Sequence, residues 1–307
     1  MPRLTRPIKV HGGKFYLSKW IIAHMPAHTH YVEPYCGGLL LLDKDPTDKS
    51  EVVNDIDGLL TNFWHVIGHP HRFAAFRRRV EGIAFSQRAF VAAKRYCSGV
   101  RDGTTQVDSV VEAAVRFFVM ARMSRQGLQK DFATLTRRRL RRGMNEQAAS
   151  WLGSVEGLTD VHARLRSVVV LNQEATAVIE SQDGPDTLHY LDPPYLHETR
   201  AVTDAYANEM DHKAHARLLH TLYDVEGKFI LSGYDSPLYR AAAKANGWRV
   251  RKINIDNKAG SGESKRVMTE CIWMNFKPPT PSVIDKRMKL HDWDAIGQPP
   301  KRKGGAA

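Results

Sequence analysis

Short apolar runs of strand length recur along this chain, and several end in a turn that carries acidic or glycine residues. Thr29–Pro34 runs into a glycine turn, Val52-Val53 leads into Asn54-Asp55, and Thr187–Leu191 ends in Asp192. Apolar residues at helical spacing fill 15–25 and 59–67, and such alternation predicts βαβ units with a parallel sheet. Ligands of these sheets bind outside the carboxyl ends of the strands, so the turns are the first place to look for a site.

The pattern changes from about His69 to Arg166, where the chain is rich in arginine and contains predicted helices such as Val110–Met123. Strand-like runs resume at Ser167–Leu171 and continue to Glu270–Asn275. We therefore predict an α/β fold with helices on both faces of the sheet. The predicted divisions are 1–68 and 167–277 for the sheet domain, 69–166 for a helical insertion, and 278–307 for a basic, Pro-rich tail that is mobile.

Composition restricts the partners and the compartment. The formal net charge of +12 favours a polyanionic partner such as nucleic acid. Cys36, Cys97 and Cys271 form no CxxC pair and lie near no histidine cluster, so neither a disulfide framework nor a metal site is indicated. No stretch approaches the roughly 20 apolar residues of a membrane span, and no apolar segment follows the basic N-terminus. We expect a cytoplasmic, nucleoid-associated protein.

Asp192-Pro193-Pro194-Tyr195 directly follows a predicted strand, so its side chains should emerge at the carboxyl edge of the sheet. Two prolines stiffen the turn, which presents one carboxylate, carbonyls without competing N–H donors, and one aromatic ring. Such a slot suits the exocyclic amine of a base such as adenine: Asp192 and the Pro193 carbonyl accept its two hydrogens, and Tyr195 stacks on the ring. The alternative is an ordinary strand-ending turn.

The order of motifs resembles the Dam-like, D12 class of DNA N6-adenine methyltransferases, from about Gly12 to Phe276. This resemblance implies a Rossmann-like, S-adenosylmethionine-dependent methyltransferase sheet whose helical insertion recognises the target. It implies site-specific methyl transfer to N6 of an adenine flipped out of double-stranded DNA, with S-adenosylhomocysteine as the other product and no metal. The catalytic residues carried over are Asp192, Pro193, Pro194 and Tyr195.

The resemblance also implies the donor-binding residues. Gly12-Gly13-Lys14 is similar to the family's GGK segment, and Glu33–Gly38 is similar to its EPF-x-G-[SG] loop, after which a helix follows. Leu39 stands where a third glycine is usual, and Val10-His11 where tryptophan often stands. The expected donor-binding set is Gly13, Lys14, Glu33, Pro34, Tyr35, Cys36, Gly37, Gly38, Asp55, Glu174 and Asp192.

Three of these residues have a specific expected role. Lys14 would approach the methionine end of the donor, although a lysine taken singly is more often a surface residue. Asp55 would bind the ribose hydroxyls and Asp57 would cap the following helix, although Asp55 could serve as that cap. Glu174 lies in a short acidic turn that would border the donor's adenine.

Within the insertion, the segment from Phe117 to Gly127 resembles the family's FYLNR-x-S-F-N-G motif, although Ala121 and Arg125 differ from it. Arginines 137–142 suit phosphates or guanine, although a charge run is usually a solvated face. The polar stretch 196–210 suits a loop that orders over the target strand. The expected DNA-binding residues are Arg122, Ser124, Gly127, Arg137, Arg138, Arg139, Arg141 and Arg142.

Two other functions remain open on the sequence alone. The enzyme could methylate adenine in RNA, or the chain could be a DNA-binding relative with impaired catalysis, as Leu39 and the missing tryptophan would allow. Methylation of a cytosine amine or of glutamine is disfavoured, because those enzymes typically carry Ser or Asn in place of Asp192. A palindromic target would allow a homodimer with one protomer per strand.

Overall fold

A computed structural model of the chain describes residues 4–10, 12–47, 49–135, 138–196, 209–256 and 267–279. Its main element is a seven-stranded sheet in the order β5-β2-β1-β6-β7-β9-β8. The strands are β1 (His30–Glu33), β2 (Ser50–Asn54), β5 (Val168–Leu171), β6 (Thr187–Leu191), β7 (Lys228–Tyr234), β8 (Arg249–Asp256) and β9 (Val267–Met274). The predicted tail from residue 280 onwards, most of the loop at 196–210, and Arg137 lie outside the described residues.

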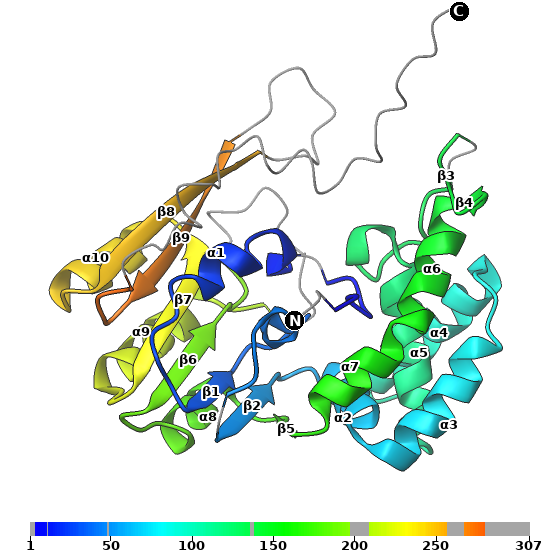
Figure 1. Cartoon of the computed structure of the whole chain (residues 1–307), viewed down its shortest axis with the longest axis horizontal. Coiled ribbons are helices and arrows are strands. Elements are labelled where there is room, and N and C mark those ends of the chain that lie inside the picture. Colours follow the sequence, from blue (N-terminus) through cyan, green and yellow to red (C-terminus); the bar gives the residue numbers. More distant parts are fainter. Residues whose placement is uncertain are drawn as a thin grey trace, which may run out of the picture.

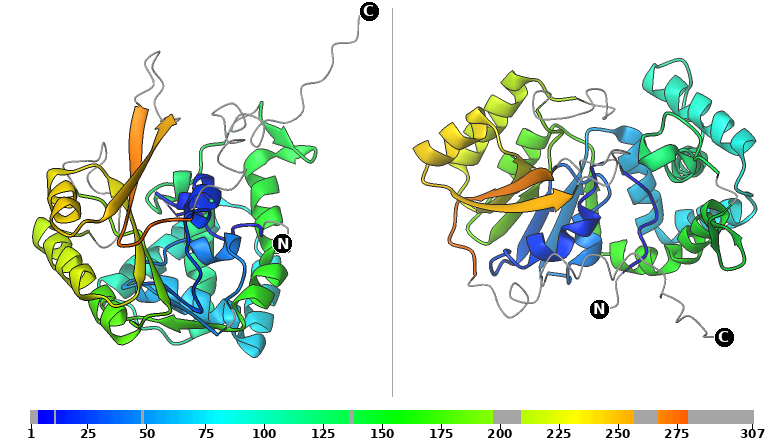
Figure 2. Two further views of the ribbon diagram at one scale, coloured as in Figure 1. Left: turned by 60° about the vertical axis from the view of Figure 1, so that its left-hand side comes forward. Right: turned by 90° about the horizontal axis from the view of Figure 1, so that it is seen from above.

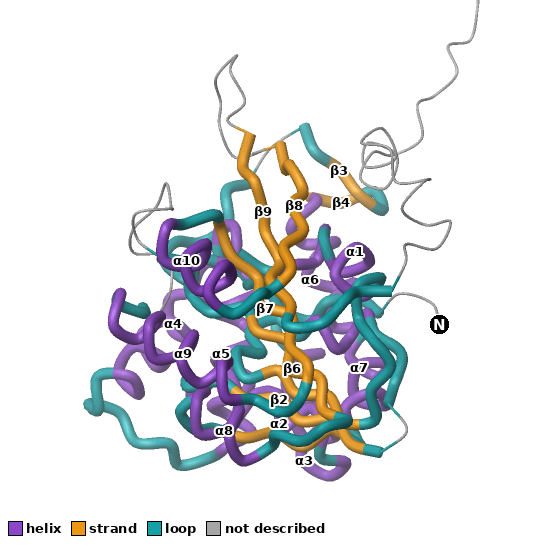
Figure 3. The backbone as a smooth tube through the Cα atoms, turned by 90° about the vertical axis from the view of Figure 1, so that its left-hand side faces the viewer, coloured by secondary structure: helices purple, strands orange, loops and turns teal. Residues whose placement is uncertain are grey.

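Strand residues alternate between two hydrophobic clusters, one on each face of the sheet. In β6, Tyr190 packs with one cluster and Leu191 with the other, and Ile230 and Leu231 of β7 divide in the same way. One face carries α8 (Ala175–Ser181), α9 (His212–Asp224) and α10 (Pro237–Ala245), and the other carries α1 (Ser18–Ile22) and α2 (Gly58–Gly68) (Figure 3). The strand order reverses between β1 and β6, which confirms the predicted Rossmann-like arrangement.

Two details of the predicted sheet domain were wrong. Strand β9 runs antiparallel to both of its neighbours, so the sheet is mixed. The glycine loop after β1 leads only into a short 3₁₀ helix, Leu40–Asp43, and not into an α-helix. Pro46 explains the second difference. The residue before a proline is disfavoured in helical conformation, so the segment between Leu40 and Pro46 is too short for a full α-helix.

The predicted first helix is shorter and interrupted. A 3₁₀ turn, Lys14–Tyr16, precedes α1, and α1 ends with Ala23 as its C-cap, before the predicted end at Pro26. This tight start brings Lys14 back toward the sheet, where its ammonium meets the turn that follows β6.

The insertion between β2 and β5 is mainly helical, as predicted. It contains α3 (Pro70–Glu81), α4 (Gln87–Arg101), α5 (Val110–Met123), α6 (Glu146–Glu156) and α7 (Leu158–Leu165), which gather on the right in Figure 1. Phe63 of α2 stacks on Phe118 of α5 with ring centroids 5.8 Å apart, so one hydrophobic core continues from the sheet into the insertion. No described helix has the length and apolar character needed to cross a membrane.

The arginine run does not extend a helix. It enters a β-hairpin made of β3 (Leu140–Arg141) and β4 (Met144–Asn145). The turn residues Arg142 and Gly143 both have positive φ, 54° and 73°, which is the requirement of a two-residue type I′ turn. This hairpin projects from the same side of the molecule as the β8–β9 pair (Figure 1).

A buried ion pair ties the sheet to the insertion. Arg164 of α7 binds Glu51 of β2 with both ends of its guanidinium, at 2.5 and 2.8 Å, and Lys44 lies 3.2 Å from the same carboxylate. Burial acts to raise the pKa of Glu51, but the two cations outweigh it and hold that pKa below its ordinary value. The pair therefore fixes α7, and with it the end of the insertion, against the edge of the sheet.

We expect Glu51→Ala to lower the free energy of unfolding by about 3–5 kcal/mol, because it leaves the buried Arg164 guanidinium without its partner. Urea unfolding followed by circular dichroism measures the effect. The matched control is Glu156→Ala, which removes the exposed partner of Arg142 and should cost at most about 1 kcal/mol. Equal losses in the two variants would show that the buried pair has no special role.

Candidate active site

The turn Asp192–Tyr195 leaves the centre of the sheet. All five residues of β6 are buried, and β6 pairs in parallel with β1 on one side and β7 on the other. The carboxyl ends of these three strands therefore meet at one edge. Pro193 and Tyr195 are buried and Asp192 and Pro194 are partly exposed, so the carboxylate has access to the surface from a rigid base.

Lys14 occupies the space in front of this turn. Its Nζ lies 2.8 Å from Asp192 Oδ1, 3.0 Å from the Gly12 carbonyl oxygen, and 4.5 Å from the centroid of the Tyr195 ring. The side chain is only 8% exposed, which overturns the alternative of a surface lysine. An amine nitrogen thus sits between a carboxylate and the face of an aromatic ring.

Glu270 of β9 completes this cluster, although no motif in the sequence predicted a function for it. Its carboxylate accepts a hydrogen bond from the Tyr195 hydroxyl and lies 3.8 Å from Lys14 Nζ. Burial raises the pKa of Glu270 to about 7, although the Lys14 charge acts in the opposite direction. The available signal was a single acidic residue at the start of an apolar strand, which is unusual in a buried position.

Tyr234, at the end of β7, packs edge-on against Tyr195 with ring centroids 4.6 Å apart. Burial raises the pKa of Tyr195 well above its ordinary value, so its hydroxyl stays protonated and remains a donor to Glu270. The Tyr195 ring is therefore held at its edge and at its hydroxyl, while Lys14 lies over its face.

The loop after β1 is held by a buried carboxylate. Glu33 is 1% exposed and accepts hydrogen bonds from the Tyr31 hydroxyl, the Leu40 amide and the Leu41 amide. Burial raises the pKa of Glu33 to about 7. The structure thus places Glu33 beneath the loop, where it fixes the backbone of Leu40 and Leu41, just after the expected donor-binding residue Gly38.

Leu39 adopts the backbone conformation of the missing glycine, with φ of 60°. This is the left-handed region that a branched side chain enters at a cost of about 1 kcal/mol or more. Its side chain is 1% exposed, and burial of that side chain offsets the backbone cost. Leu39 therefore combines a positive-φ backbone in this loop with a side chain that belongs to the core.

Asp55 lies where β2 ends, and its carboxylate accepts hydrogen bonds from the amides of Gly37 and Asp57, each at 3.1 Å. Burial raises the pKa of Asp55 to about 6. The carboxylate still has acceptor capacity for a diol, since two oxygens offer about four acceptor positions. Asp57 accepts from the Leu59 amide as the N-cap of α2, as the sequence predicted.

Asn54, which is fully buried, joins three strand ends and was not singled out by the sequence. Its side-chain amide donates to the carbonyls of Pro34 and Gln173 and accepts from the Gln173 amide, at 2.9, 3.0 and 2.9 Å. The loops after β1, β2 and β5 are therefore in direct contact. This brings Glu174, an exposed residue before α8, to the same edge as Asp55.

The remaining expected donor-binding residues also follow β1 or precede α1. Tyr35 is largely buried beside Glu174 and Asp55, and burial raises its pKa above the ordinary range. Cys36 is buried with a free thiol, and its amide donates to the Asn54 carbonyl at 2.8 Å. Gly13 is exposed next to Lys14. The expected donor residues thus surround the ends of β1, β2 and β6.

A family model for the D12 class N6 adenine-specific DNA methyltransferases matches residues 11–255. The chain belongs to this family. No similar sequence was found among curated proteins. The family confirms the resemblance drawn from the motifs, and with it an enzyme that methylates adenine in DNA. Within the described part of the chain, no group of three or more His, Cys, Asp or Glu side chains could hold a metal ion.

The residues expected to bind DNA in this D12 methyltransferase fall into two groups. Arg122 is mostly buried and donates to the carbonyl and hydroxyl oxygens of Ser150, each at 2.9 Å; burial lowers its pKa to about 10. Ser124 is fully buried and Gly127 is packed against the backbone of Lys9. By contrast, the described arginines of the hairpin region are exposed: Arg138, Arg139, Arg141 and Arg142.

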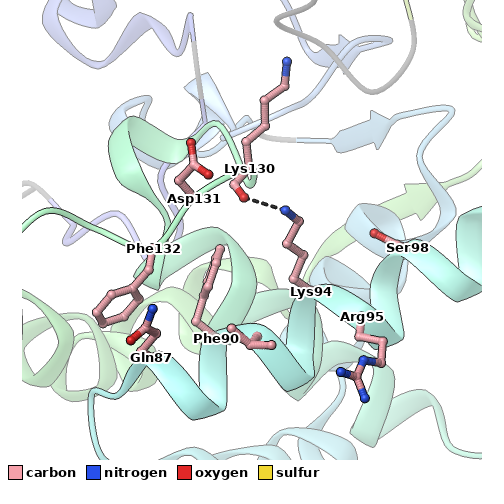
Figure 4. A pocket seen from close by; sticks show the side chains of 9 residues that line it. Gln87, Phe90, Lys94, Arg95, Ser98, Lys130, Asp131 and Phe132 are labelled. Atoms are coloured by element: carbon pink, nitrogen blue, oxygen red, sulfur yellow. Dashed lines mark hydrogen bonds between the residues drawn. The ribbon is translucent and has the colours of Figure 1, made fainter.

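A hollow of about 400 Å³ lies elsewhere on the D12 methyltransferase, between α4 and the loop that contains Lys130 and Phe132. Figure 4 shows Lys94 donating to the Lys130 carbonyl across it, while the Arg95 guanidinium points away. Its charged groups therefore do not converge on a common point, and it lies on the insertion instead of at the carboxyl edge. At the carboxyl edge of the sheet, the Lys14 side chain lies in front of the Asp192–Tyr195 turn.

We expect the contribution of Glu33 to stability to fall as pH rises from about 4.5 to about 7, because folded Glu33 then keeps a proton that the unfolded chain releases. Glu33→Gln removes this titration and should reduce the loss of unfolding free energy between about pH 5 and about pH 8 by up to about 3 kcal/mol. Chemical unfolding at each pH measures it. The control is Glu180→Gln, which changes an exposed residue and should keep the wild-type dependence of unfolding free energy on pH. The same dependence on pH in Glu33→Gln as in wild type would contradict the prediction.

Proposed function

We propose that this chain is a site-specific DNA adenine methyltransferase that uses S-adenosylmethionine to methylate N6 of an adenine flipped out of double-stranded DNA. The observation that carries the proposal is the position of Lys14 Nζ, 2.8 Å from the Asp192 carboxylate and over the face of Tyr195. A carboxylate and a ring face that already hold one amine suit the exocyclic amine and the ring of adenine. Family membership supplies the class of acceptor.

The residues at the ends of β1 and β2 suit the donor. Asp55 would accept the ribose hydroxyls, Glu174 would border the adenine, and the loop Glu33–Gly38 would lie along the donor with Gly37 in a positive-φ conformation of 42°. Gly13 and Lys14 would lie toward the methionine end. S-Adenosylmethionine supplies an electrophilic methyl group. The fit rests on Asp55, because its buried carboxylate accepts hydrogen bonds from the Gly37 and Asp57 amides and still has capacity for further donors.

The acceptor nitrogen needs positioning, since its lone pair is delocalised into the ring. If the amine donates one hydrogen bond to the Asp192 carboxylate and the other to the Pro193 carbonyl, its lone pair faces the methyl-donor side of the site. The proton released when nitrogen gains its methyl group is within reach of Asp192. Lys14 must leave Asp192 for adenine to enter, and Glu270, 3.8 Å from Nζ, remains to balance its charge.

The hairpin supplies the surface for duplex DNA. The β3–β4 hairpin projects on the side toward which the carboxyl ends of β6 and β7 point (Figure 1), and its described arginines are exposed, whereas Arg122, Ser124 and Gly127 are packed in the interior. We therefore assign the contacts with phosphates or base edges to Arg138, Arg139, Arg141 and Arg142. Binding to a palindromic site would place one protomer on each strand and allow a homodimer.

We expect labelled S-adenosylmethionine and duplex DNA to yield N6-methyladenine with the wild-type enzyme, and Asp192→Ala to lower kcat by at least about a hundredfold. Nucleoside analysis by mass spectrometry identifies the product. The control is Asp224→Ala, which removes an exposed carboxylate at the end of α9. Methylation of RNA alone would support the RNA alternative, and a wild-type enzyme that methylates no nucleic acid would reject the proposal.

We expect Arg138→Gln/Arg141→Gln to weaken DNA binding and to make the plot of log K against log salt concentration less steep by up to about 1.8, which is about 0.9 per lost phosphate contact. Fluorescence anisotropy with a labelled duplex measures this slope. Arg77→Gln removes an exposed charge on α3, at the opposite end of the insertion (Figure 1). An equal change of slope in both variants would show that net charge, and not the hairpin, sets the affinity.

A further inference from the structure

Residues 4–10, the N-terminal strap, run between the sheet domain and the helices of the insertion (Figure 2). Two glycines of the insertion allow the close approach. A Cβ added at Gly157 would lie 2.7 Å from Thr5 Cβ, and one added at Gly127 would lie 2.8 Å from the Lys9 carbonyl oxygen. Lys9 Nζ also donates to Gln147 of α6 at 3.4 Å. One side of the strap is therefore fitted to the insertion.

The other side of the strap touches the loop after β1. The Arg6 guanidinium donates to the carbonyls of Gly38 and Leu39 and pairs with Asp43 at 2.7 Å. Val10 Cγ2 lies 3.5 Å from a Cβ built on Gly38, and Val10 Cγ1 lies 3.8 Å from one built on Gly37. Arg6 thus donates hydrogen bonds to carbonyl oxygens of this loop, while the buried Glu33 carboxylate accepts hydrogen bonds from the amides of Leu40 and Leu41.

The two sets of contacts are mechanically connected through a short, well-packed segment. Ile8 lies between them and is 4% exposed in the main hydrophobic core. Leu39 holds a left-handed backbone with φ of 60°, and a guanidinium that binds its carbonyl opposes relaxation of that peptide. A shift of the strap therefore moves the same loop residues that are expected to lie along the methyl donor.

We propose that the N-terminal strap positions the donor loop, with Arg6 as a positioning residue, and that the Thr5–Gly157 contact links that loop to the target-recognition insertion. This inference rests on the proposed function, because it takes the loop after β1 as part of the donor site. Through the Thr5–Gly157 contact, the insertion would influence the affinity for the methyl donor independently of its contacts with DNA.

The first test replaces Arg6. Arg6→Gln raises the Kd for S-adenosylhomocysteine, measured by calorimetry, and the KM for S-adenosylmethionine by about tenfold, because the loop carbonyls lose a charged donor. The value of kcat at saturating donor stays within about twofold of wild type, since Asp192 and Tyr195 are untouched. Arg77→Gln, an exposed arginine on α3, is the control for lost charge. A lower Tm with unchanged Kd and KM would reduce Arg6 to a structural residue and overturn its assignment.

The second test acts from the insertion side and does not depend on Arg6 variants folding. Gly157 has φ of −75°, so alanine is tolerated by its backbone, but its Cβ pushes Thr5. Gly157→Ala raises the Kd for S-adenosylhomocysteine by about threefold or more, and adding Thr5→Gly restores it. Gly153→Ala, one turn earlier in α6 where a Cβ would meet nothing within 4 Å, leaves Kd unchanged. A Gly157→Ala variant with wild-type Kd, or one that Thr5→Gly does not restore, refutes the link.

Asp55→Ala separates failure of this inference from failure of the proposed function. Wild-type binding of S-adenosylhomocysteine that Asp55→Ala abolishes confirms the donor site, and the strap variants are then judged against it. If wild type does not bind S-adenosylhomocysteine, or if Asp55→Ala binds it normally, the donor site itself is wrong and the strap loses its role with it.

Discussion

Parallel strands buried on both faces bring their carboxyl ends to one edge, and the chemistry of this enzyme depends on that constraint. β1, β2 and β6 each leave the sheet in a polar turn, and Asn54 joins the turns after β1, β2 and β5 through one buried amide. The residues proposed to bind the donor and to catalyse at these strand ends need no long-range contact of their own to meet. Their proximity follows from the strand order and from the fully buried character of β6.

Buried carboxylates hold this edge together, and each is stabilised in a different way. Glu51 is neutralised by two cations, Glu33 by hydroxyl and amide donors, and Glu270 by Lys14 and Tyr195. Burial raises the pKa of Glu33 and of Glu270 to about 7, whereas the pKa of Glu51 is held below its usual range. The hydroxyl and amide donors to Glu33 thus compensate for burial less completely than the guanidinium and ammonium beside Glu51 do.

Much of the sheet domain was predictable, because its strands are apolar runs that end at recognisable turns. β6 and α5 have the predicted bounds, and Asp57 caps α2 as expected. Strand β8 was not predicted, since it has no continuous apolar run and Arg251-Lys252 interrupts its alternation of polar and apolar residues. The β3–β4 hairpin was not predicted either, because its turn needs a positive φ at Arg142, a conformation that arginine rarely adopts.

The site was predictable where a motif had a local cause and unpredictable where a partner came from far along the chain. Asp192 and Asp55 end strands, so their positions follow from local sequence. Glu270 reaches Tyr195 across 75 residues, and Arg6 reaches Leu39 across 33, and neither pairing leaves a local signal. Ser124 and Gly127 match the family motif, yet both are packed in the interior. A motif shows which residue type is required at a position, but not whether packing or DNA binding requires it.

The two-residue turn of the β3–β4 hairpin also constrains how the surface proposed to meet DNA can change between related chains. Leu140 pairs with Asn145 and Arg141 pairs with Met144, and neighbouring residues of a strand point to opposite faces. Inserting one residue into either strand would exchange the face that carries Arg141 for the face that carries Leu140. A change in length at the hairpin would thus exchange the pair that carries a charge, Arg141 and Met144, for the uncharged pair Leu140 and Asn145 in a single step.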